Sequence, residues 1–144
     1  MIGLDTSFLV ALCVREHASH RAANRLLEKE ITGQAGSCAL APQVLTEFVH
    51  VVTDPKRFEK PLDMAAALDL CDQWWNAEEV RTVSPEPETG HLFTTWMRQH
   101  RLGRKRILDT FLAATYHAAG VETVLTTDWR DFSTFGVFTV RLVE

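Results

Sequence analysis

Short apolar runs alternate with longer segments of helical periodicity, and this alternation limits the fold more than any other feature of the sequence. The predicted strands are Ile2–Leu4, Ser37–Ala41, Arg81–Val83, Thr123–Thr126 and Val137–Leu142. The predicted helices are Thr6–Val14, Ala18–Ile31, Gln43–Thr53, Asp63–Asn76, Pro87–His100 and Leu108–Ala119. Strands separated by helices of this length pair in parallel, with helices on both faces of the sheet. We therefore expect a three-layer α/β/α sandwich with a mostly parallel central sheet.

Length and composition fit a single domain that spans residues 1–144. Hydrophobic residues make up 46% of the chain, enough for a core that buries roughly 70% of the unfolded surface. The three cysteines are odd in number and form no CxxC pair, so we expect reduced thiols and a cytoplasmic protein. The apolar N-terminus has no basic segment, and no window reaches the ~18 apolar residues of a membrane span, so we expect no membrane association.

The net charge is −4, with 19 acidic residues against 15 lysines and arginines. A protein that grips a duplex mainly through its phosphates has a pI above ~9, so the charge argues against this class. It leaves room for an acidic catalytic pocket with a local basic rim. Residues 100–106 contain the candidate RNA-binding cations Arg101, Arg104, Lys105 and Arg106. These four either form an ordinary solvated helix end or hold RNA phosphates.

Four acids from distant parts of the chain are predicted to meet at one place. Asp5 and Asp128 each follow a predicted strand, where the carboxyl ends of parallel strands form a ligand-binding crevice. Glu47 and Asp109 lie on the apolar stripes of two predicted helices, where an unpaired charge is costly. The long intervals between the four exclude a local ion-binding loop such as an EF-hand. The cluster therefore forms only when the chain folds.

Each acid also has a simpler explanation. Asp5, Asp109 and Asp128 are candidate helix caps, and Glu47 is a candidate ion-pair partner. The joint pattern of two strand-end acids and two inward-facing helical acids favours a shared site. Asp131 is a possible substitute for Asp128 and ranks behind it.

Crowded carboxylates raise one another's pKa unless a counter-charge is present. Magnesium, with manganese as its natural substitute, prefers carboxylate and water oxygens and suits such a cluster. A bound ion of this kind activates water and stabilises the leaving oxygen of a phosphodiester. The spacing leaves open whether one ion or two would bind.

Four segments of the chain read "LDTSFLVAL", "LTEFVHVVTDPKRF", "ILDTFLAATYHAAGVETVLTTDWRDF" and "GVFTVRLV". Together they resemble a PIN domain of the VapC type, the toxin of bacterial type II toxin–antitoxin pairs. The resemblance implies metal-binding and catalytic roles for Asp5, Glu47, Asp109 and Asp128, and ligand-orienting hydroxyls on Thr6 and Thr127. It further implies magnesium-dependent endoribonuclease activity, a homodimer, and inhibition by a cognate antitoxin.

Two other functions remain as alternatives. One is a non-cleaving module that binds RNA or protein on the same fold. The other is a phosphohydrolase of a doubly wound fold. The sequence Asp5-Thr6-Ser7 argues against it, because an aspartate-nucleophile phosphatase needs a D-x-D pair. No Ser, Cys or His is placed for covalent catalysis, so we expect metal-activated water to attack the phosphodiester.

Overall fold

A computed structural model describes all 144 residues and contains one five-stranded sheet whose neighbouring strands are all parallel. The strands are β1 (Ile2–Leu4), β2 (Cys38–Leu40), β3 (Val80–Thr82), β4 (Thr123–Thr126) and β5 (Thr139–Leu142), in the order β3-β2-β1-β4-β5. The helices are α1 (Thr6–Cys13), α2 (His20–Leu26), α3 (Pro42–Val52), α4 (Met64–Trp75), α5 (Pro87–Gln99), α6 (Ile107–Ala118) and α7 (Arg130–Ser133). The expected three-layer α/β/α arrangement is confirmed.

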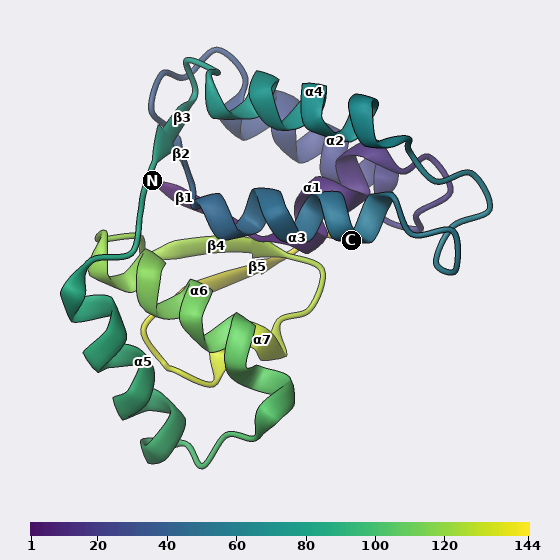
Figure 1. The fold of residues 1–144 in the computed structure, drawn as a ribbon. Helices are drawn as coiled ribbons and strands as arrows, with labels where there is room; N and C mark the ends of the chain where they lie inside the picture. The colour runs from purple at the N-terminus through teal and green to yellow at the C-terminus, as the bar shows by residue number, and fades with distance from the viewer.

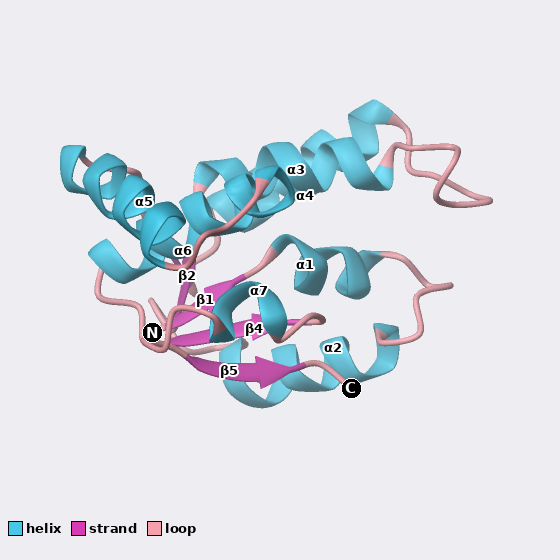
Figure 2. Cartoon of the chain, turned by 90° about the horizontal axis from the view of Figure 1, so that it is seen from below, coloured by secondary structure: helices cyan, strands magenta, loops and turns pink.

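The strand order reverses direction at β1, and this reversal decides which helices cover which face. The chain runs outward from β1 through β2 to β3, and then returns across the sheet to β4 and β5. Right-handed crossovers place the helices of the two halves on opposite faces. Figure 1 shows α1 to α4 on one side of the sheet and α5 to α7 on the other, and Figure 2 shows the strands between the helical layers. The carboxyl ends of β1 and β4 are therefore the expected switch-point crevice.

All five predicted strands match the structure within two residues, and the differences in kind concern one predicted helix and one short helix that was not predicted. The predicted helix Ala18–Ile31 divides into α2 and a π-helical turn, Leu27–Ile31, where the Thr32 N–H bonds the Leu27 carbonyl. The predicted strand Val137–Leu142 starts at Thr139, because Gly136 makes a turn with φ 67° just before it. The single-turn helix α7 was not among the predicted helices.

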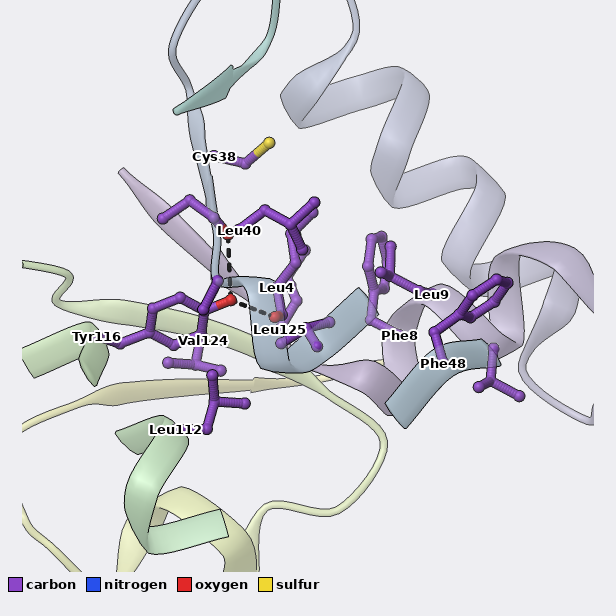
Figure 3. Packing of buried hydrophobic residues seen from close by; sticks show 14 of the residues in the cluster. Leu4, Phe8, Leu9, Cys38, Leu40, Phe48, Leu112, Tyr116, Val124 and Leu125 are labelled. Carbon is purple, nitrogen blue, oxygen red and sulfur yellow. Dashed lines mark hydrogen bonds between the residues drawn. The ribbon is translucent and has the colours of Figure 1, made fainter. Parts of the chain in front are cut away.

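The core fixes α6 against the sheet through one buried tyrosine (Figure 3). Tyr116 is fully buried and donates its hydroxyl hydrogen bond to the Leu4 carbonyl at 2.5 Å, with the Ala39 carbonyl 3.3 Å away. Gly3 leaves room for the ring, since a Cβ there would lie 3.0 Å from both Tyr116 and Val121. The helix that carries Asp109 is thus tied to the strand that leads to Asp5.

None of the helices combines the length and the apolar character needed to cross a lipid bilayer.

Candidate active site

Asp5 is held at the end of β1 by hydroxyl groups from two segments. The pairing of Leu4 with Leu125 places Asp5 beside Thr126. Its Oδ2 accepts hydrogen bonds from the Ser7 hydroxyl at 2.7 Å and from the Thr126 hydroxyl at 2.8 Å. Burial raises the pKa of Asp5, and these two hydrogen bonds oppose the rise. Asp5 occupies the N-cap position of α1, but its side chain makes no capping bond.

Glu47 reaches the same place from α3. The buried Thr6 donates its hydroxyl hydrogen bond to Glu47 Oε2 at 3.0 Å, which joins the start of α1 to the middle of α3. Loss of solvent around the carboxylate raises the pKa of Glu47, and repulsion from Asp5 adds to the rise. Thr6 therefore orients this carboxylate.

Asp109 lies in the first turn of α6, and the structure decides between its possible roles. Arg106 occupies the N-cap position, so Asp109 is not the cap. Its Oδ2 is 3.9 Å from Arg106 Nε, which is an ion-pair distance and longer than a hydrogen bond. Burial, followed by repulsion from Asp131, Asp5 and Glu47, raises its pKa from 3.8 to about 7.

Asp131, rather than Asp128, lines the pocket with the other three acids. Burial and then repulsion from Asp5 raise the pKa of Asp131 to about 6. Asp128 instead accepts a hydrogen bond from the Arg130 backbone N–H at 3.0 Å and pairs with the Arg130 side chain at 3.6 Å. The sequence ranked Asp131 behind Asp128, and in the structure it is Asp131 that lies on the pocket wall. The reason is α7, whose single turn carries residue 131 back toward β1.

These acids surround an open pocket of about 450 Å³. Its wall consists of Asp5, Thr6, Ser7, Val10, His17, Glu47, Val51, Arg57, Phe58, Asp109 and Asp131. Arg57 is more than half exposed and pairs with Asp54 at 3.5 Å, so the acids have little positive charge of their own. The pocket therefore carries more negative than positive charge and is open to solvent.

The donor set fits a hydrated hard cation. No group of three Asp, Glu, His or Cys side chains is arranged to hold a metal ion by direct contact alone. The pocket nevertheless gathers four carboxylates whose burial raises their pKa values, and repulsion between acids adds to the rise for Glu47, Asp109 and Asp131. Magnesium keeps several of its waters and is commonly held by one or two carboxylates, so these carboxylate oxygens suit it.

The four predicted RNA-binding cations are not alike in the structure. Arg101, Arg104 and Lys105 are exposed beyond α5, whereas the Arg106 side chain turns inward against α7.

The predicted ligand-orienting hydroxyl of Thr127 makes no hydrogen bond. The threonine hydroxyl that donates to Asp5 belongs instead to the neighbouring residue, Thr126.

Sequence reasoning missed Ser7 and Thr126 as supports of Asp5. Ser7 carries a signal in its spacing, because a short hydroxyl two residues after an aspartate can bond it. Thr126 has a signal only once the register between β1 and β4 is known. His17 and Phe58 lie on connecting loops, and nothing local to them indicates a pocket.

The parallel sheet and the acids gathered at its carboxyl edge are of the kind that the PIN domain family model describes, and that model matches residues 2–137. The chain therefore belongs to the PIN domain family. It is 26% identical over 136 residues to Ribonuclease VapC24 of Mycobacterium tuberculosis, covering 94% of this chain and 92% of that protein.

Solved structures show the same fold. The M. tuberculosis VapC20 toxin, described as cleaving the sarcin–ricin loop, superposes with a TM-score of 0.74 at 22% identity, covering 98% of this chain and 99% of that one. VapBC2 of Rickettsia felis, solved with a promoter DNA fragment, gives a TM-score of 0.69 at 16% identity and covers both chains fully, at 100% each.

Proposed function

We propose that this protein is a VapC-type endoribonuclease that hydrolyses RNA phosphodiesters with a bound divalent ion, Mg²⁺ or, in its place, Mn²⁺. The observation that carries the proposal is the convergence of Asp5, Glu47, Asp109 and Asp131 on one pocket. The ribonuclease relative, which matches over 94% of the chain, supports it. A divalent ion in such a pocket supplies charge stabilisation and lowers the pKa of water, so that hydrolysis proceeds near neutral pH.

The residues of this chain would hold the ion and orient its ligands. Ser7 and Thr126 engage one oxygen of Asp5 and leave the other oxygen for the pocket. Thr6 fixes Glu47 in the same way. Asp109 and Asp131 complete the oxygen set, and Asp128 keeps the start of α7 in place through the Arg130 N–H. Thr127 contributes its backbone N–H to Ser7 at 2.9 Å.

Exposed cations beside the pocket would bind the RNA backbone. Arg101, Arg104 and Lys105 precede α6, and Arg57 lies on the pocket wall. Phosphate contacts of this kind are sensitive to salt, because binding releases counterions from the RNA. RNA affinity is therefore expected to fall steeply with ionic strength, although the protein as a whole is acidic.

The test is an RNA cleavage assay on protein freed of any antitoxin. Structured RNA is incubated with the protein in MgCl₂, with EDTA as the metal-free control. Asp5→Asn and Asp109→Asn are expected to lower the cleavage rate about 10- to 100-fold or more, the range found when support of a metal site is lost. Asp69→Asn, an exposed acid on α4, is the matched control and retains full activity.

Cleavage that survives both active-site substitutions, or that proceeds in EDTA, would refute the metal-nuclease proposal. RNA binding without any cleavage would favour the alternative of a non-cleaving module. A release of phosphate from small phosphomonoesters, without RNA cleavage, would favour the phosphohydrolase.

We further propose a cognate antitoxin, a homodimer and a cytoplasmic location. The antitoxin is supported by structural neighbours solved as toxin–antitoxin complexes, from Klebsiella pneumoniae at a TM-score of 0.66 among others. The cytoplasmic location is supported by three free cysteines. Size-exclusion chromatography with light scattering tests the dimer, and co-purification with the product of a neighbouring reading frame tests the antitoxin.

A further inference from the structure

Arg106 differs from the other basic residues of its segment because its side chain is engaged within the protein. Only 25% of the side chain is exposed. Its Nη2 donates hydrogen bonds to the carbonyl oxygens of Arg130 at 3.2 Å and Asp131 at 3.1 Å, with Thr134 Oγ1 at 3.4 Å. The hydrogens of Nη2 are therefore directed at acceptors within the protein rather than at solvent.

The acceptors belong to α7, a helix that needs outside support. A helix of one turn has no internal partners for its last four carbonyls and does not form in isolation. Arg106 donates to two of these carbonyls, that of Arg130, which also accepts from the Thr134 hydroxyl, and that of Asp131 itself. The backbone of the residue whose side chain lines the acidic pocket is thereby attached to the start of α6.

The same guanidinium also faces the acid on α6. Its Nε lies 3.9 Å from Asp109 Oδ2 and is buried without a hydrogen-bond partner in the protein. Arg106 therefore contacts α7 with one nitrogen and faces Asp109 with another. The one side chain thus links the backbone of α7 to the first turn of α6.

We propose that Arg106 is a positioning residue that holds α7, and with it Asp131, against the start of α6, so that Asp131 and Asp109 face the same divalent ion. The inference rests on the proposed function only for the ion's role. The planar guanidinium is required because it reaches two carbonyls and a carboxylate together, which the single ammonium of lysine does not.

The first test uses protein without RNA. Arg106→Lys and Arg106→Gln are compared with wild type and with Arg21→Gln, an exposed arginine on α2, as the matched control. Amide hydrogen exchange is expected to speed up in residues 130–134 of both Arg106 variants, while the exchange rates of the five strands stay unchanged. Mg²⁺ affinity, measured by calorimetry with MgCl₂, is expected to fall about 10-fold or more in both variants.

The direction of the Mg²⁺ result separates positioning from charge. Loss of a positive charge 3.9 Å from Asp109 would, by electrostatics alone, tighten Mg²⁺ binding. Tighter binding by Arg106→Gln, or wild-type affinity in Arg106→Lys, would therefore overturn the proposal. Unchanged exchange in residues 130–134 would overturn it as well.

The second test asks whether Arg106 acts through Asp131. In an Asp131→Asn background, Arg106→Gln is expected to cause little further loss of Mg²⁺ affinity, because the group that it positions is already gone. Equal losses of Mg²⁺ affinity in the wild-type and Asp131→Asn backgrounds would show that Arg106 does not act through Asp131.

Cleavage kinetics provide the third test. With RNA, the Arg106 variants are expected to lower kcat with KM little changed, whereas a phosphate contact would raise KM. A raised KM with unchanged kcat would assign Arg106 to RNA binding and overturn the proposal. If wild type cuts no RNA, the proposed function fails, while hydrogen exchange and calorimetry still decide whether Arg106 positions Asp131.

Discussion

Asp109→Asn is expected to stabilise the protein in the absence of metal. At pH 8 the folded protein carries a carboxylate at this position whose pKa is raised to about 7, against 3.8 in the unfolded chain. One pKa unit corresponds to about 1.4 kcal/mol, so ionised Asp109 costs the fold up to about 4 kcal/mol. Asparagine keeps the shape and removes the charge.

Two favourable interactions are lost with that charge, and both are smaller. The Arg106 pair, at 3.9 Å and partly exposed, is worth ~0–1 kcal/mol. An acid in the first turn of α6 gains ~0.3–1 kcal/mol from the helix dipole. Burying the new amide also has a cost. The net gain is therefore about 1–3 kcal/mol, or roughly 3–10 °C in Tm for a domain of this size.

The assay is thermal unfolding followed by circular dichroism in EDTA at pH 8 and again at pH 4, with Asp69→Asn as the control. The gain is expected to be nearly gone at pH 4, where Asp109 is protonated in the folded protein and about half protonated in the unfolded chain. In MgCl₂ the wild type is expected to recover the difference, because ion binding adds stability that the variant lacks. A lower Tm for Asp109→Asn in EDTA at pH 8 would refute the reasoning and show that the Arg106 pair dominates.

Three further predictions follow from the same contacts. In EDTA, the free energy of unfolding of wild type, measured with urea, is expected to fall as pH rises from about 4 to 7. The raised pKa values keep Asp109 and Asp131 protonated in the folded protein after the unfolded chain has released these protons. A rise in this free energy over the same range would contradict the prediction. Thr126→Val is expected to lower the free energy of unfolding by about 1–3 kcal/mol and to weaken Mg²⁺ binding in calorimetry. Thr127→Val is expected to have a smaller effect on both, because the Thr127 hydroxyl makes no hydrogen bond. Equal effects of the two variants would show that Thr126 does not act on the site. Tyr116→Phe is expected to lower Tm by roughly 2–4 °C, because it loses a hydrogen bond worth about 1 kcal/mol; an unchanged Tm would refute the anchoring role.

The sequence predicted the layers and the parallel sheet because both follow from the period of the apolar residues. It also indicated Asp5 and Asp109, since an acid at a strand end or on an apolar stripe conflicts with its surroundings in a way visible locally. Boundaries were less certain where the pattern is weak. β5 begins at Thr139 because the turn at Gly136 occupies the residues before it.

The choice between Asp128 and Asp131 depends on tertiary structure and could not be made from spacing. The two acids lie three residues apart. Which of them faces the crevice depends on whether the chain after β4 is extended or helical. The single turn α7 places Asp131 on the pocket wall, and it accepts hydrogen bonds from Arg106, which lies 24 residues before its first residue. For the same reason, Arg106 could not be distinguished from its exposed neighbours by its charge.

The buried hydroxyl of Tyr116 fixes α6 relative to the sheet, so the length of helix between Tyr116 and Asp109 sets where Asp109 lies. Asp109 precedes Tyr116 by seven residues, which at 1.5 Å per residue is about 10 Å, close to two full turns. Inserting or deleting one residue between them would rotate the acid by about 100° around the helix and away from the pocket. Length changes among relatives of this chain are therefore expected outside the segment from Arg106 to Ala118, which carries both Arg106 and Asp109.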